Sequence, residues 1–120
     1  MDQSYNTLLK TILPESISEY FTLTALKKDD QKEVMDLYLQ ENNTVPVEYS
    51  NVKLSSKGFF DEVTIQDFPI RGYKVFLHVK RRRWLNEDSG LVVFRNWDVI
   101  AKGTRITKDF AAFLKEISRY

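Results

Sequence analysis

The 120-residue sequence contains no cysteine and a single histidine, His78. Without cysteine the chain forms no disulfide and offers no thiolate ligand, and one histidine cannot build a histidine-rich zinc site. We therefore expect no metal and no other cofactor. No hydrophobic run approaches the roughly 18 apolar residues of a membrane span, and the N-terminus carries Asp2 where a signal peptide would be basic. We expect a cytoplasmic protein without membrane contact.

Glycine and proline are also scarce, with four and three residues. The hydrophobic content of 42% and the length are those of one ordinary folded domain. We predict a single domain over residues 1–120. Within it, residues 1–42 form helices and a first hairpin, 43–56 form a loop, and 57–120 form a basic hairpin region and a C-terminal helix.

Apolar periodicity indicates where helices and strands lie. Spacing typical of a helix precedes Pro14, and a second short helix follows it. Alternation with a period of two over 21–26 and 34–39 predicts a β-hairpin. A second hairpin is expected around the turn Pro69-Ile70-Arg71-Gly72, with a return strand over 91–97.

The C-terminal segment has the strongest helix signals. Thr107 is a good N-cap, and Asp109 lies in the first turn near the positive end of the helix dipole. Phe110, Phe113, Leu114 and Ile117 then recur on one face. The predicted class is α+β, with short N-terminal helices, four to five antiparallel strands and a C-terminal amphipathic helix.

The net charge of +1 conceals an asymmetry along the chain. The first 60 residues hold six lysines against nine acids, a net charge of −3, whereas the last 60 hold twelve basic residues against eight acids, a net charge of +4. All seven arginines lie in the second half. The positive charge is local, which favours a polyanionic partner for that half.

The strongest basic feature is the run Lys80, Arg81, Arg82 and Arg83 at the end of a predicted strand over 74–84. Alternation places Arg81 and Arg83 on one face and Lys80, Arg82 and Trp84 on the other. Unpaired cations are costly to bury, so the strand must leave the core at Lys80. Arginine grips phosphate oxygens bidentately, which makes the run a candidate DNA contact.

An alternative reading of this run stays open: its cations pair with Asp61, Glu62, Glu87 or Asp88 and only add solubility. Trp84 likewise either stacks on a base or forms part of the core. Arg71, Lys74, Arg95 and Arg105 are further candidate DNA contacts. His78 is read as a packed histidine, and we expect no catalytic residue and no metal ligand.

Two segments together resemble a known family. They read KGFFDEVTIQDFPIRGYKVFLHVKRRRW and VVFRNWDVIAKGTRITKDFAAFL, and the specific part spans roughly residues 57–107. The chain resembles the N-terminal region of bacterial insertion-sequence transposases of the ISAon type, related to transposases with an N-terminal zinc-binding module. The shared frame consists of an Asp-x-Pro turn, a following glycine, an arginine run with an aromatic, and a helix-opening threonine: Asp67, Pro69, Gly72, Arg82, Arg83, Trp84 and Thr107.

The zinc-binding relatives carry two cysteine pairs where this sequence reads NNTVPVEYSN and LNEDSG. The resemblance therefore implies a module without zinc, whose corner would be held by Val45, Val47, Tyr49 and Leu85. It implies DNA transposition, with contact to terminal inverted repeats, and strand cleavage by a metal-dependent DDE domain on a separate or downstream polypeptide. The chain itself would not be an enzyme.

The resemblance implies two partners, DNA and the catalytic transposase chain, and leaves association with further copies of the chain open. A different function also remains open: a protein-interaction or regulatory module that pairs with the catalytic chain without strong DNA binding. In that case Phe110 and Phe113 would belong to an interface and not to the core. A small hydrolase has little support, because no nucleophile-histidine pair is evident in the sequence.

Overall fold

The computed structural model describes residues 3–95 and 105–118 and is elongated, with extents of 53 × 36 × 25 Å. Its helices are α1 (Gln3–Ile12), α2 (Glu15–Tyr20), a 3-10 turn η1 (Val47–Tyr49) and α3 (Lys108–Ile117). Its strands are β1 (Phe21–Asp29), β2 (Val34–Glu41), β3 (Leu54–Phe59), β4 (Val63–Ile70), β5 (Tyr73–Lys80), β6 (Arg82–Asn86) and β7 (Val92–Val93). The predicted α+β class is confirmed, as are the break near Pro14 and the C-terminal helix.

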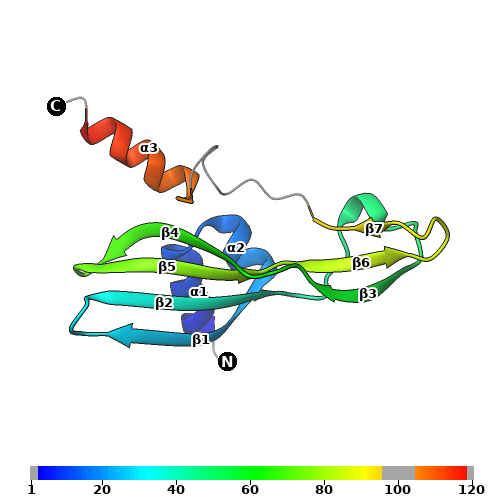
Figure 1. Ribbon diagram of the computed structural model, residues 1–120, viewed down its shortest axis with the longest axis horizontal. Coiled ribbons are helices and arrows are strands. Elements are labelled where there is room, and N and C mark those ends of the chain that lie inside the picture. The colour runs from blue at the N-terminus through cyan, green and yellow to red at the C-terminus, as the bar shows by residue number, and fades with distance from the viewer. Residues whose placement is uncertain (1–2, 96–104, 119–120) are drawn as a thin grey trace.

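The strands form two sheets that lie end to end (Figure 1). A four-stranded sheet has the order β1-β2-β5-β4, and a three-stranded sheet has the order β3-β6-β7. The described residues form seven strands where four to five were expected, and β2 pairs with β5 in parallel although only antiparallel pairs were expected. Of the return strand predicted over 91–97, the structure contains β7, and positions 96 and 97 lie outside the described residues.

One long ribbon connects the sheets. The segment β3–β4 pairs antiparallel with β5–β6, from Leu54 opposite Asn86 to Ile70 opposite Tyr73 at the tip. The register shifts between Ser56 and Phe59, where Gly58 has a φ of +84°, and again after Asp67. Bulges of this kind bend a strand and increase its twist, which explains how one ribbon enters two sheets.

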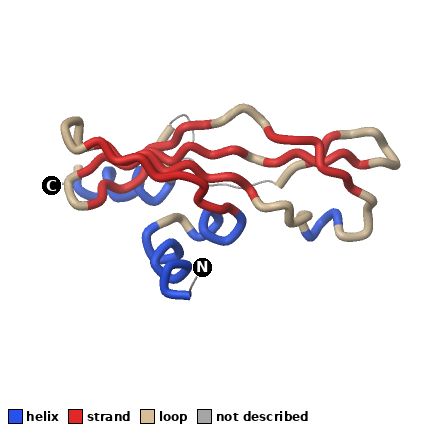
Figure 2. Tube along the Cα trace, turned by 90° about the horizontal axis from the view of Figure 1, so that it is seen from below, coloured by secondary structure: helices blue, strands red, loops and turns tan. Residues whose placement is uncertain are grey.

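The main hydrophobic core lies between the four-stranded sheet and the first two helices. Figure 2 shows α1 and α2 on the same side of the sheet. The buried core residues on these elements are Leu13, Ile17, Phe21, Leu37, Leu39, Ile65, Val75, Leu77 and Val79. Odd-numbered side chains of β2, β4 and β5 therefore face the helices, and the even-numbered ones face outward.

The three-stranded sheet has a smaller core on the other face of the ribbon. Trp84 is only 1% exposed, and Pro46 and Val93 are buried with it. Val79 and Trp84 are both buried and are five positions apart in the sequence. Because side chains alternate between the two faces of a strand, an odd separation means that these two buried residues lie on opposite faces of the ribbon. Val45 and Val47, expected to hold this corner, are instead 40% and 82% exposed.

Residues 43–56, predicted as a loop, include the 3-10 turn and the start of β3. The strand reads LSSKGF, so it lacks the alternation of apolar residues that would have revealed it. Among the described residues, no helix is both long enough and apolar enough to span a bilayer.

Candidate nucleic-acid interface

The basic run lies where the ribbon passes from one sheet to the other. Lys80 ends β5, Arg81 bridges the two strands, and Arg82 and Arg83 begin β6. Lys80 is exposed and the three arginines are half-buried. The strand thus leaves the core at Lys80 as predicted, because neither core extends over the crossing.

Two of the arginines stack on one aromatic ring. The guanidinium carbons of Arg81 and Arg83 lie 4.7 and 5.5 Å from the ring centroid of Phe60. The shared ring confirms that these two side chains lie on one face. Stacking holds a guanidinium by its flat face and leaves its N–H edge available to an anion. Phe60 in turn meets exposed Phe94 edge-on, at 5.2 Å between centroids.

Arg82 points the other way and is used internally. Its Nε donates to the backbone oxygen of Glu41 at 3.3 Å, and its Nη1 donates to Ser56 Oγ at 3.1 Å. Its guanidinium also lies 4.6 Å from the Phe59 ring centroid. Arg82 therefore joins β2 to β3, and two of its five side-chain N–H groups are used in these bonds.

Neutralisation by nearby carboxylates is absent in the described part of the chain. None of the cations Lys80, Arg81, Arg82 and Arg83 forms an ion pair there. Glu87 pairs with Lys53 at 3.3 Å, and Glu62 approaches His78 at 3.8 Å. The Glu41 carboxylate accepts the Arg82 backbone N–H at 2.9 Å but is paired with Arg95, and exposed Asp61 is next to Phe60 in the chain. The crossing keeps an excess of positive charge.

One further cation joins this cluster that the sequence did not single out. Arg83 Nη2 donates to the backbone oxygen of Lys57 at 3.2 Å, which brings the exposed Lys57 beside the run. Arg83 Nε is buried without a hydrogen-bond partner. The sequence did contain a signal for Lys57 as part of a basic site, because this lysine lies two residues before the aromatic pair Phe59-Phe60. We call Lys57, Lys80, Arg81 and Arg83 the crossing cluster.

Two predicted contacts are wrong because their side chains are enclosed. Trp84 is 1% exposed and its Nε1 donates to Asn43 Oδ1 at 2.9 Å, so the indole cannot stack on a base. The Arg95 side chain is 10% exposed and pairs through Nε with Glu41 at 3.3 Å. Its guanidinium also covers the Tyr20 ring at 3.9 Å. Arg95 belongs to the internal structure of the junction.

Three other candidates lie away from the crossing cluster. Arg71 and Lys74 are exposed at the opposite end of β5, and the six residue steps from Lys74 to Lys80 span roughly 20 Å. Arg105 is exposed beside β4 and lines a pocket on the outward face of the four-stranded sheet. The structure therefore divides the predicted contacts into separate groups.

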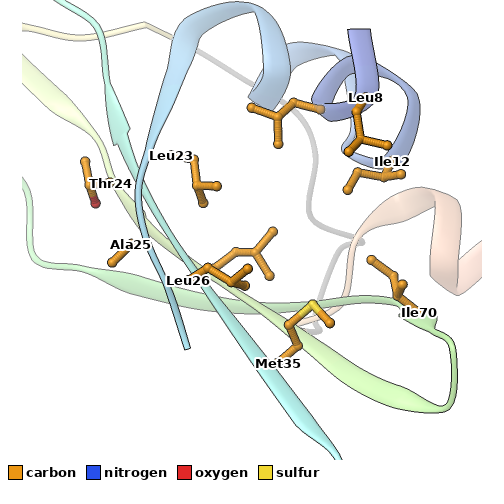
Figure 3. A pocket seen from close by; sticks show the side chains of 10 residues that line it. Leu8, Ile12, Leu23, Thr24, Ala25, Leu26, Met35 and Ile70 are labelled. Atoms are coloured by element: carbon orange, nitrogen blue, oxygen red, sulfur yellow. The ribbon is translucent and has the colours of Figure 1, made fainter. Parts of the chain in front are cut away.

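A different surface is apolar. A pocket of about 340 Å³ lies between α1 and the sheet (Figure 3). In Figure 3 Leu8 and Ile12 on α1 lie opposite Leu26 and Met35 on the strands. Leu8 and Leu26 are each 55% exposed, so α1 does not close over this end of the sheet. We call this pocket the α1 groove.

The chain shows no match to a protein-family model, to a curated protein or to a solved structure. Within the described residues, no three acidic, histidine or cysteine side chains are grouped to hold a metal ion. A function is therefore inferred from the geometry of the two surfaces described above, the crossing cluster and the α1 groove.

Proposed function

We propose that this chain binds DNA through the crossing cluster, as the N-terminal module of an insertion-sequence transposase. The observation that carries the proposal is the stacking of Arg81 and Arg83 on Phe60 without a carboxylate partner. Two guanidinium groups held side by side match the repeated phosphates of a nucleic-acid backbone. The resemblance of residues 57–107 to ISAon-type transposases supports DNA as the polyanion, and strand cleavage is assigned to a separate catalytic chain.

Salt dependence tests the proposal. If Lys80, Arg81 and Arg83 each neutralise one phosphate of duplex DNA, the logarithm of affinity should fall with log salt with a slope of about −3, at about 0.9 per phosphate. The double variant R81A/R83A should reduce that slope by about 2. Arg82 is left unchanged, because its removal would disturb the junction. Fluorescence anisotropy with a labelled duplex gives both values.

The matched control removes two cations at the far end of β5. R71A/K74A changes the net charge equally but lies roughly 20 Å from Lys80, so the slope should remain that of the wild type. An equal loss of slope in both variants would mean that binding follows net charge and not the crossing cluster. That result would contradict the proposal.

A second candidate function is favoured by the α1 groove. The groove is open and apolar and lies beside β1, the strand at one edge of the four-stranded sheet. Such a surface suits a protein partner, and the catalytic transposase chain is the partner proposed. On α3, Phe113 is 46% exposed and also available to a partner, whereas Phe110 is buried against Phe68. Light scattering after size exclusion, with and without the catalytic chain, tests it. L8E/L26E should abolish a complex that R81A/R83A leaves intact.

A further inference from the structure

A shallow pocket on the outward face of the four-stranded sheet combines a cation with an aromatic ring. It lies on the face opposite α1 and α2, since its strand residues carry even numbers. Its lining residues are Thr64, Gln66, Phe76, Arg105 and Ile106. We call it the β4–β5 pocket, and it is separate from the crossing cluster.

The backbone fixes Arg105 beside this pocket. Gln66 N donates to the Arg105 oxygen at 2.8 Å, and Thr107 N donates to the Gln66 oxygen at 2.9 Å. Ile106 forms a parallel bridge with Gln66, so this segment adds to the edge of β4. The Arg105 side chain itself is exposed and makes no ion pair with the described residues. The backbone of Arg105 is therefore fixed while its guanidinium is exposed, and an exposed guanidinium is a ready phosphate ligand.

A row of hydrogen bonds borders the pocket. Thr64 Oγ1 lies 3.0 Å from His78 Nδ1, and Asp36 Oδ1 lies 2.7 Å from His78 Nε2. The structure thus contains a hydroxyl–histidine pair that the sequence alone did not reveal. If His78 is neutral, its Nε2–H donates to Asp36 and the Thr64 hydroxyl donates to Nδ1.

The charges on this face decide what the pocket can hold. Asp36 and Glu62 are the acids next to His78, and both are already near that imidazole. Tyr38 presents neither ring face to a ligand, because it stacks on His78 at 4.5 Å and Lys27 lies 5.1 Å from its centroid. Phe76 is half-buried and lines the pocket. Inside the pocket a ligand meets one guanidinium and one phenyl ring, and the Asp36 and Glu62 carboxylates lie beside His78, between the pocket and Lys80.

Of the crossing cluster, Lys80 lies on the same face of the ribbon as the pocket, whereas Arg81 and Arg83 lie on the other face. Phe76 and Lys80 share the outward face of β5 and are four residue steps apart, which spans about 13 Å. That distance corresponds to about four nucleotides at the rise of a duplex strand, and to fewer in an extended single strand. A strand held at Lys80 therefore reaches the pocket within a few nucleotides.

We propose that one single strand of DNA runs along the outward face of β5 from Lys80 of the crossing cluster to the β4–β5 pocket, where Arg105 binds a phosphate and Phe76 contacts a base. This inference rests on the proposed DNA binding and adds its substrate class. A base inside a duplex stays stacked on its neighbours, so its flat face is not available to the Phe76 ring. The face of an unpaired base is available, and contact with an aromatic ring accepts any base.

Oligothymidylates of two lengths, about 4 and about 12 nucleotides, test the path by fluorescence anisotropy. R105Q removes the cation and F76L removes the ring while keeping apolar bulk. Each should weaken binding of the longer oligomer by about tenfold, in line with the loss of one stacked base. R71Q is the matched control, because it removes one exposed arginine at the far turn and should retain wild-type affinity.

The outcomes separate the two proposals. If R81A/R83A weakens binding but R105Q and F76L do not, the path is overturned and DNA binding at the crossing stands. If the wild type binds neither single-stranded nor duplex DNA, both proposals fail. If F76L weakens a blunt duplex as much as the longer oligomer, the assignment to a single strand is wrong. Far-UV circular dichroism of each variant establishes that it is folded.

Discussion

The carboxylate of Glu41 and the guanidinium of Arg95 form an ion pair at the junction of the two sheets, with Nε and Oε2 3.3 Å apart. Glu41 is 1% exposed, and its other oxygen accepts the backbone N–H of Arg82 at 2.9 Å. Arg95 Nη2 donates in addition to the Thr44 oxygen at 2.6 Å. The last residue of β2 is thereby tied to both the start of β6 and the segment after β7.

Breaking this pair from one side should be costly. E41A leaves the Arg95 guanidinium enclosed without its anion, and the free energy of unfolding should fall by about 3–5 kcal/mol. The double variant E41L/R95M removes both charges and keeps most of the volume, so it should be more stable than E41A. Urea unfolding followed by tryptophan fluorescence measures both. A double variant less stable than E41A would show that the charges themselves hold the junction.

The bond between Thr107 and Asp67 should carry a pH signature. Burial raises the pKa of the Asp67 carboxyl, although hydrogen bonds from the Thr107 hydroxyl and the Phe68 N–H partly oppose the shift. A carboxyl whose folded pKa is raised stabilises the fold most below its ordinary pKa, and this contribution is lost as the pH rises through the raised value. D67N keeps an acceptor for the Thr107 hydroxyl, which donates at 2.8 Å, but does not titrate.

The unfolding free energy of the wild type relative to D67N should therefore decrease as the pH rises through the acidic range. Urea unfolding at a series of pH values measures this difference, and an increase with pH would contradict the expected sign.

Thr107 also caps α3 by accepting from Phe110 N at 3.3 Å. T107A should consequently cost about 1–2 kcal/mol, whereas T107S retains the hydroxyl and serves as control.

The turn between β4 and β5 places two residues in the left-handed region. Arg71 has a φ of +52° and Gly72 a φ of +86°, the pattern of a type I′ hairpin turn. G72A should destabilise the hairpin by about 1–2 kcal/mol, because a side chain is strained there. R71N should be at least as stable as the wild type, since Asn-Gly is the preferred pair. Thermal unfolding of both variants checks whether G72A is less stable than the wild type and R71N at least as stable. A less stable R71N would indicate a packing role for the arginine.

Two neighbouring arginines should differ in their effect on stability. R82A removes bonds to Ser56 and to the Glu41 backbone, so the free energy of unfolding should fall by about 1–3 kcal/mol. R81A removes a side chain that contacts Phe60 alone among the described partners, and should stay within about 0.5 kcal/mol of the wild type. Chemical denaturation of R81A and R82A measures the difference between their free energies of unfolding. Equal losses would place Arg81 in the internal structure as well.

Local patterns account for the part of the fold that the sequence predicts. Alternation identified the hairpin of β1 and β2 and that of β4 and β5, and Thr107 caps α3 as its position indicated. The parallel pairing of β2 with β5 joins segments some 40 residues apart. No local signal records such a pairing, because any apolar strand of suitable length could occupy that place.

The candidate site was predictable in charge but not in geometry. The arginine run and its exit from the core followed from the cost of burying cations. The switch of burial between Val79 and Trp84 did not, since alternation continues unbroken while the covering elements change. Glu41 gave no signal either, because a carboxylate at a strand end is usually solvated and its arginine partner lies 54 positions away.

The odd spacing between Val79 and Trp84 makes the length of the crossing as important as its composition. Adding or deleting one residue at Arg81 would move each side chain of β6 to the opposite face of the strand. The Trp84 indole would then face the solvent, and the Arg83 guanidinium would face the small core. Substitutions there alter contacts one at a time, whereas a change in length would exchange the whole interior of the second sheet for its surface. Evolution of this segment is thus expected to vary its residues far more readily than their number.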